Sequence, residues 1–326
     1  MLGKDNIPFK VGMRSNSNFI FFHNLVKLIL FKKVEGASEA DKLRRIGVYP
    51  AWLMTLKEAL LPILINAVGP KIHAFQFGGQ KGKNVAIAKI KALLMASRFS
   101  LNKWCLLDVK KAFDSVDKAK LRTTLLSILP NTASSQLLIT LYDIDFNLMY
   151  AISDNLISPE RGLIQGDPWA PLLFTLYINK VLELTNANAN GNHHSQAFID
   201  DILIMAKEIP DLQNQTNTVT SLLEELNLLI NPNKSELISN NSKDSIEISG
   251  STIHANQEGK YIGQYVDSDG KAKHVLKENC FGKMYDILRQ TKDISLLARI
   301  RLFNIYSKTK INHWLPILAL SESRGH

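Results

Sequence analysis

Residues 197–205 are Ala-Phe-Ile-Asp-Asp-Ile-Leu-Ile-Met, two short runs of strand-forming apolar residues with two adjacent carboxylates between them. This pattern predicts a β-hairpin with an acidic tip. Neighbouring side chains of a strand point to opposite faces, so Asp200 and Asp201 share one solvated surface only if the turn splays them. Two interpretations stay open: Asp simply suits a tight turn, or the pair lies in a cleft where divalent cations neutralise it.

The composition is that of a globular chain with a basic surplus. The 326 residues are 45% hydrophobic and 21% charged, which excludes disorder of the whole chain. Lys and Arg outnumber Asp and Glu by 39 to 30, and the net charge of +9 favours a polyanionic partner such as nucleic acid, although many anion-binding proteins share it. Two cysteines, Cys105 and Cys280, exclude a disulfide framework, and we expect Cys105 in the core.

The N-terminal apolar run, residues 19–31, is too short to span a bilayer and is interrupted by polar residues. We therefore expect no membrane partner and no secretion. The sequence does not distinguish a cytosolic, a nuclear and an organellar location.

The first part of the chain alternates extended and helical patterns. Two runs, residues 28–33 and 43–48, predict a basic hairpin, and leucines at helical spacing predict a helix over residues 51–68. A loop with three glycines and two lysines, residues 75–84, precedes a helix predicted over residues 85–97. Such a loop suits a phosphate, because glycine allows close backbone approach and a helix N-terminus favours anions, but a plain turn explains it equally well.

A continuous apolar run over residues 104–109 predicts a buried central strand that carries Asp108 near its end. Asp108 is therefore the first candidate partner for Asp200 and Asp201. A helix is predicted next, over residues 118–129, with Asp117 as a cap or first-turn acid.

The second part of the chain begins with a Gly- and Pro-containing loop, residues 161–171, whose Gly166 implies a close backbone approach. Further expectations are a hydrophobic helix over 172–184, a polar loop over 186–194 with solvated His193 and His194, a helix over 218–229, a turn carrying Lys234, and helices from about residue 275 onward. The basic face of the last helices is either solvated or follows a phosphate backbone.

In this order the segments resemble the motifs of reverse transcriptases, especially those of non-LTR retrotransposons and group II introns. Seven segments match the family order within residues 28–263: 43–46 (the RPI segment, here without proline), 75–83 (QFGFRKGRS type), 107–116 (first catalytic motif), 161–174 (RGLxQGxxLSPxLF), 198–201 (YxDD), 231–236 and 261–263. The chain departs from the pattern at Phe198, where Tyr is usual, and at Trp169-Ala170, where Leu-Ser is common.

The resemblance implies RNA-directed DNA synthesis at a site with two Mg²⁺ ions, for which Mn²⁺ is a possible substitute. Asp108 and Asp200 would bridge both ions, Asp201 would contribute more weakly, and the Val109 carbonyl would bind the nucleotide-bound ion. Lys234 would be the general acid for pyrophosphate. Hard cations prefer carboxylate oxygens, and a two-ion site stabilises both the attacking and the leaving oxygen.

The resemblance also implies the substrate contacts. Phe113 would pack against the sugar and reject a 2′-hydroxyl, which points to deoxynucleotides, and Gln165 and Gly166 would contact the incoming nucleotide and the template. The candidate triphosphate contacts are Arg45, Lys81 and Lys83.

The fold expected from the resemblance is α+β, a right-hand polymerase. Its parts are an N-terminal segment and fingers (1–101), a palm of antiparallel sheet packed on helices with inserted fingers elements (102–266), and a short helical thumb (267–326). The expected partners are an RNA template, a DNA or RNA primer and dNTPs. No endonuclease, RNase H or zinc module is recognisable, so we expect target cleavage to need another protein.

Two alternative functions stay open at this point. One is a domesticated, RNA-binding structural subunit, against which the three carboxylates argue. The other is an RNA-dependent RNA polymerase, against which Phe113 and the loop of Gln165 and Gly166 argue.

Overall fold

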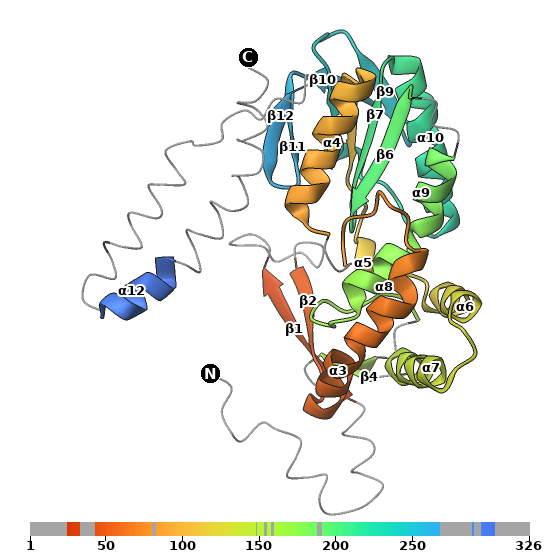
Figure 1. Ribbon diagram of the computed structural model, residues 1–326, viewed down its shortest axis with the longest axis vertical. Coiled ribbons are helices and arrows are strands. Elements are labelled where there is room, and N and C mark those ends of the chain that lie inside the picture. The colour runs from red at the N-terminus through yellow and green to blue at the C-terminus, as the bar shows by residue number, and fades with distance from the viewer. Residues whose placement is uncertain are drawn as a thin grey trace, which may run out of the picture. The chain divides into compact units, whose positions relative to one another are not determined.

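The computed structural model describes residues 25–32, 43–79, 83–147, 149–152, 155–157, 160–187, 191–267, 289 and 295–303. The chain divides into two compact units (Figure 1). Unit 1 comprises residues 1–72, 111–178 and 226–228, and unit 2 comprises residues 73–110, 179–225 and 229–326. The predicted domain boundaries after residues 101 and 266 do not coincide with the points at which the chain passes from one unit to the other. These boundaries stay a prediction.

Unit 2 is built on a six-stranded sheet with the strand order β6-β7-β3-β8-β10-β9. The strands are β3 (Lys103–Leu107), β6 (His193–Phe198), β7 (Asp201–Ala206), β8 (Glu236–Ile238), β9 (Ser245–Ile248) and β10 (Ser251–Asn256). All neighbours are antiparallel except β8 and β10. A hairpin of β11 (Glu258–Tyr261) and β12 (Gln264–Asp267) follows the sheet.

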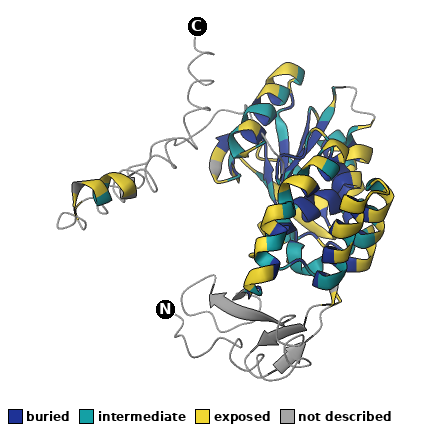
Figure 2. Cartoon of the chain, turned by 60° about the horizontal axis from the view of Figure 1, so that its bottom comes forward, coloured by how far each residue is buried: buried dark blue, intermediate teal, exposed yellow. Residues whose placement is uncertain are grey.

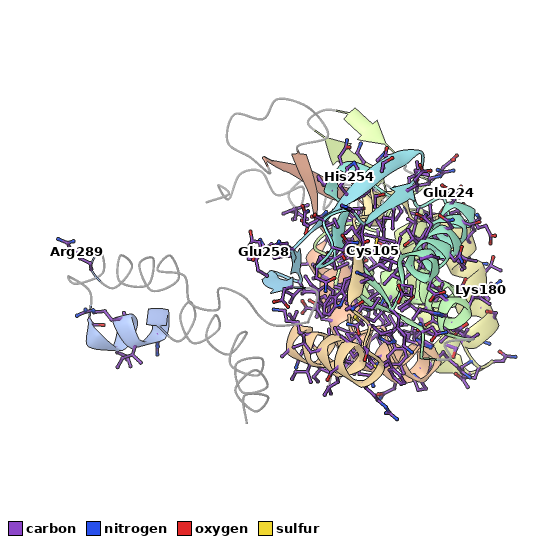
Figure 3. The ribbon with its side chains drawn as sticks, turned by 90° about the horizontal axis from the view of Figure 1, so that it is seen from above. Cys105, Lys180, Glu224, His254, Glu258 and Arg289 are labelled. Carbon is purple, nitrogen blue, oxygen red and sulfur yellow. The ribbon has the colours of Figure 1, made fainter. Side chains whose placement is uncertain are left out.

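Helices pack on both faces of this sheet around β3, β6 and β7, whose residues are mostly buried (Figure 2), whereas β10 is exposed. Helix α4 (Val85–Phe99) packs on the face that carries Trp104 and Leu106. Because strand side chains alternate, Cys105 points to the opposite face, where α10 (Ile209–Glu225) packs beside α9 (Asn179–Asn186). Cys105 lies deep among side chains (Figure 3), and burial raises the pKa of its thiol to about 12, as expected of a core residue.

Unit 1 combines a small sheet with a group of helices. The sheet has the order β2-β1-β4-β5, from β1 (Leu25–Lys32), β2 (Leu43–Val48), β4 (Met149–Ile152) and β5 (Asn155–Ile157). The helices are α3 (Ala51–Val68), the 3₁₀ turn η3 (Gly69–Lys71), α5 (Ala112–Ser115), α6 (Lys118–Ile128), α7 (Ala133–Phe146) and α8 (Ala170–Tyr177). Helix α7 packs on both α3 and α6.

Helix α3 together with η3 is long and apolar enough to cross a membrane, judged by length and composition alone. Core helices pass the same criterion. The buried Lys57 in the middle of α3 is paired with Asp145 and Asp167, an arrangement typical of a helix packed within a protein.

Most predicted elements are confirmed. The basic hairpin is the antiparallel pair β1 and β2, the acidic hairpin is β6 and β7, and α3 begins and ends at the predicted residues. Asp117 is the N-cap of α6, since its side chain accepts from the Lys120 N–H. Of the helices predicted from residue 275, α12 (Leu296–Phe303) is described, and the rest lies outside the described residues.

Two predicted helices are wrong in extent. The helix expected over 172–184 is broken at Ile178 into α8 and α9, where the chain passes from unit 1 to unit 2. The helix expected over 218–229 is α10, which begins at Ile209. Its buried stripe contains Leu212, Thr216 and Val219, and the polar Thr216 hides the apolar period in the sequence.

The prediction of a polar loop with two solvated histidines is also wrong. His193 and His194 begin β6, and His194 is buried. Its imidazole packs edge-on against the ring of Phe75, with the two ring centroids 4.3 Å apart. Burial lowers the pKa of His194 to about 4, the Gln196 hydrogen bond opposes the shift, and the charges of Lys91, His73 and His193 add to it.

This burial predicts an acid-sensitive fold. As the pH falls below 6.5, the unfolded chain binds a proton at His194 that the folded protein takes up only near pH 4, so folding stability falls. Urea unfolding at pH 7.5 and pH 5 should show a loss of about 2 kcal/mol from this group. His194→Leu should remove that part of the difference, whereas His254→Gln, on the exposed β10, should keep it. Equal pH dependence in His194→Leu and wild type would contradict the assignment.

Candidate active site

Three carboxylates lie at one end of three adjacent strands in unit 2. Asp201 begins β7 and pairs with Phe198, so Asp200 lies in the two-residue turn that joins β6 and β7. The β3–β7 register pairs Leu107 with Ile202, and one further step along it brings Asp108 opposite Asp201. The central pairing of the sheet thus groups the three residues predicted from the apolar runs.

The electrostatics of these carboxylates favour a cation. Burial, followed by the charges of Asp200 and Asp108, raises the pKa of Asp201 to about 6. Burial and the charge of Asp108 also raise the pKa of Asp200. Clustered anionic oxygens repel one another until a positive charge lies between them, and hard divalent cations prefer such oxygens.

A metal would need ligands besides these side chains. Within the described residues, no group of three or more His, Cys, Asp or Glu is arranged to hold an ion by itself. Mg²⁺ in phosphate-processing sites is typically bound by one or two carboxylates together with substrate phosphates and water. The donor set therefore fits an ion that arrives with a nucleotide.

The backbone around Asp108 is tied to the turn that carries Lys234. The Asn231 N–H donates to the Asp108 carbonyl at 2.7 Å, and the Asp108 N–H donates to the Ser235 hydroxyl at 3.2 Å. Lys234 closes the 3₁₀ turn η4 (Pro232–Lys234) between these two partners. Neither bond uses the carbonyl of Val109, the predicted metal ligand.

The glycine loop contains the two lysines predicted to bind the triphosphate, and the structure describes only Lys83. Lys81 lies outside the described residues. The Lys83 ammonium donates to the backbone carbonyls of Ala74 at 3.0 Å and Gln76 at 2.9 Å, with a longer bond to His73 at 3.4 Å. Burial lowers the pKa of Lys83. Its role as a triphosphate contact stays a prediction.

Unit 1 contains the remaining predicted residues. The Gly47 N–H donates to the Gln165 carbonyl at 3.0 Å. Gly166 has φ of +105°, and a Cβ there would lie 3.1 Å from the Gly47 carbonyl oxygen. The predicted close approach at Gly166 is therefore confirmed, and its neighbour is strand β2. Arg45 belongs to that strand, and its side chain lies outside the described residues.

Phe113 lies in the short helix α5 and is partly buried. Its ring stacks on Phe174 of α8, with centroids 4.9 Å apart and planes 21° from parallel. The Phe113 carbonyl accepts from the Leu163 N–H at 2.7 Å, which ties α5 to the loop before Gln165.

The sequence did not reveal a buried ion pair beside this loop. The Lys57 ammonium lies 2.5 Å from an Asp167 carboxylate oxygen and 3.2 Å from Asp145. The Trp169 N–H donates to Asp167 at 2.9 Å, and its indole N–H donates to the Lys57 carbonyl at 2.7 Å. Asp167 directly follows Gly166, so this cluster fixes the loop to helix α3. The sign of this ion pair in the sequence is Lys57 itself, a lysine that lies among the apolar residues of α3.

Comparison with known proteins identifies the family. Residues 31–266 match the family model described as reverse transcriptase (RNA-dependent DNA polymerase). The chain belongs to the reverse transcriptase family.

Curated relatives of the chain include polyproteins of R2 retrotransposable elements. The chain is 28% identical over 191 residues to a Pol polyprotein of the type-1 retrotransposable element R2 of Popillia japonica, covering 52% of this chain and 32% of that protein. It is 25% identical over 221 residues to the R2DM polyprotein of Drosophila melanogaster, covering 64% and 21%. The chain thus spans a third or less of the length of these reverse transcriptase relatives.

Solved structures agree on the fold. Apo telomerase from Candida tropicalis superposes with a TM-score of 0.57 and 11% identity, covering 82% of this chain and 52% of that one. Telomerase from the same yeast in complex with a TWJ fragment of telomeric RNA gives 0.56 and 11%, covering 92% and 53%. The predicted α+β, right-hand polymerase fold of this reverse transcriptase is confirmed.

The buried ion pair predicts a large, site-specific stability loss. Lys57→Met should lower the free energy of unfolding by about 3 to 5 kcal/mol, because it leaves the carboxylate of Asp167 unpaired in the interior. Adding Asp167→Asn should recover part of the loss by removing that charge. The matched control is Arg122→Met, whose pair with Asp143 is solvent-accessible and should matter far less. Similar urea midpoints for Lys57→Met and Arg122→Met would contradict this account.

Proposed function

We propose that this chain copies RNA into DNA by adding deoxynucleotides to the 3′-hydroxyl of a primer. The observation that supports this best is the cluster of Asp108, Asp200 and Asp201 at the end of three adjacent strands. In phosphoryl transfer the protein forms few covalent bonds with the substrate. Catalysis therefore depends on positioning the reacting groups and on neutralising the negative charge of the phosphates. The names of the relatives support a retroelement RNA as the template.

Asp108 and Asp200 would hold two Mg²⁺ ions, for which Mn²⁺ is a substitute, with Asp201 as a weaker contributor. Reverse transcriptases as a family use divalent metals. When bound, such ions activate the attacking hydroxyl and stabilise the leaving oxygen. The mutual repulsion of the carboxylates supports this role, because a site that destabilises its own empty form gains from binding cations.

Other residues would handle the nucleotide. Lys234 would give a proton to the leaving pyrophosphate, and its turn is tied by Asn231 to the segment of Asp108. Gln165 and Gly166 would contact the nucleotide and template. Arg45, Lys81 and Lys83 would bind the triphosphate. For Lys83 this binding requires that its ammonium give up the backbone carbonyls to which it now donates.

One assay separates the three candidate functions. Poly(rA)/oligo(dT) is incubated with Mg²⁺ or Mn²⁺ and either dTTP or UTP. A reverse transcriptase incorporates dTTP, an RNA-dependent RNA polymerase prefers UTP, and a structural RNA-binding subunit incorporates neither. Absence of dTTP incorporation with both metals would refute the proposal.

The carboxylate assignment predicts loss of synthesis without loss of fold. Asp108→Asn and Asp200→Asn should each abolish primer extension, because each removes a metal ligand. Their melting temperatures should stay at or above wild type, since removing one of several clustered negative charges relieves repulsion. Asp211→Asn, in the first turn of α10, is the matched control and should extend normally. Wild-type extension by folded Asp200→Asn would refute the assignment.

The sugar-selection role of Phe113 predicts a change of substrate. Phe113→Val should raise the rNTP-to-dNTP ratio of kcat/KM by roughly 10- to 200-fold, the range over which steric pockets discriminate. Phe174→Leu is the control, because it removes the ring stacking under Phe113 while leaving the Phe113 side chain in place. An unchanged ratio in folded Phe113→Val would make Phe113 an ordinary packing residue.

A further inference from the structure

The turn that carries Asp200 has a costly backbone conformation. Ile199 and Asp200 are its two central residues, and Ile199 has φ of +59° while Asp200 does not have a positive φ. Positive φ at the first central position alone is the pattern of a type II′ turn, where glycine is normally required. A β-branched residue there is strained, so the conformation persists only if the surroundings hold it.

The side chain of Gln76 stabilises this conformation of the turn by hydrogen bonds. Its Oε1 accepts from the Ile199 N–H at 3.1 Å and from the Gly78 N–H at 3.1 Å. Its Nε2 lies 3.4 Å from the Ile199 carbonyl oxygen as a longer donor contact. Gln76 has no exposed surface, so water does not compete for these groups.

Hydrogen bonds of the surrounding backbone fix the position of Gln76. The Phe77 N–H donates to the Ala197 carbonyl at 2.9 Å, and the Ala197 N–H donates to the Phe75 carbonyl at 3.0 Å, so this segment runs parallel to β6. The Lys83 ammonium binds the Gln76 carbonyl at 2.9 Å. Gly78 lets Ile199 approach, since a Cβ there would lie 2.8 Å from the Ile199 nitrogen.

We propose that Gln76 is a positioning residue that locks the Ile199–Asp200 turn and thereby aims the carboxylates of Asp200 and Asp201. The Ile199 carbonyl belongs to the peptide that leads into Asp200, so fixing both polar groups of Ile199 fixes the direction from which the Asp200 side chain starts. The catalytic consequence rests on the proposed function, whereas the locking of the turn does not.

An amide suits this position for a chemical reason. It offers an acceptor to two N–H groups and a donor to a carbonyl while carrying no charge. A glutamate would keep the acceptor but would add a fourth negative charge beside residues whose pKa values are already raised by their neighbours. A methionine would keep the unbranched shape and lose all three contacts.

The test compares Gln76→Met with Gln196→Met. Gln196 is an equally buried glutamine on β6, but its amide donates to the Ala88 carbonyl and the Tyr261 hydroxyl, and neither belongs to the turn. Hydrogen exchange is measured on peptides that cover residues 197–203, without metal or nucleotide. In Gln76→Met the Ile199 amide should exchange at least about tenfold faster, and in Gln196→Met at the wild-type rate.

Kinetics supply the second readout. Gln76→Met should lower kcat by about 10- to 100-fold, the usual consequence of misplaced catalytic groups, and should raise the Mg²⁺ concentration for half-maximal activity. The KM for template-primer should not change. Gln196→Met, even if it melts earlier, should keep kcat and the Mg²⁺ dependence below its melting temperature.

Two further variants make the proposal refutable if Gln76→Met folds poorly. Gln76→Glu keeps the acceptor, so its Ile199 amide should stay protected. Ile199→Gly removes the strain, so it should restore most of the kcat lost in Gln76→Met. Unchanged Ile199 exchange in Gln76→Met, or an equal fall of kcat in Gln196→Met, would overturn the proposal. An inactive wild-type protein with exchange as expected would refute the proposed function and leave the locked turn standing.

Discussion

Electrostatic repulsion among Asp108, Asp200 and Asp201 is the constraint on which the architecture of unit 2 depends. Three carboxylates this close together would move apart if the backbone beneath them could yield. They are held by β3, which is central, apolar and paired on both sides. Helices on both faces bury that strand, so the hydrophobic interior stabilises an unfavourable arrangement of charge at its edge.

The sequence predicts this framework well because its signals are local. Apolar runs next to carboxylates predict β3, β6 and β7 with Asp108, Asp200 and Asp201 at their ends, and a stop at Gly69 and Pro70 predicts the end of α3. Where a buried position is polar, the prediction fails. The polar Thr216 interrupts the apolar spacing by which the first half of α10 would be recognised. His194 lies in a polar, Asn-rich stretch typical of a loop, but it belongs to strand β6. Such residues are recognisable only from their partners, which are distant in the chain.

The same limit explains the residues that sequence reasoning missed at the site. Lys57 in unit 1 and Gln76 in unit 2 are fully buried, and both hold a turn with positive φ, at Gly166 and at Ile199. Apolar packing alone does not select one turn geometry among several of similar compactness. A buried polar side chain does, because a wrong geometry leaves its donors and acceptors unsatisfied.

The short parallel pairing of Phe75–Phe77 with β6 has a consequence unrelated to chemistry at phosphorus. Strand β6 is the outermost strand on its side of the six-stranded sheet, and an outermost strand with open N–H and C=O groups is a template for pairing with other chains. The bonds to Ala197 occupy part of that edge. Loosening this segment would therefore open more of the β6 edge and favour self-association of the protein, so the residues that pair with Ala197 also bear on its solubility.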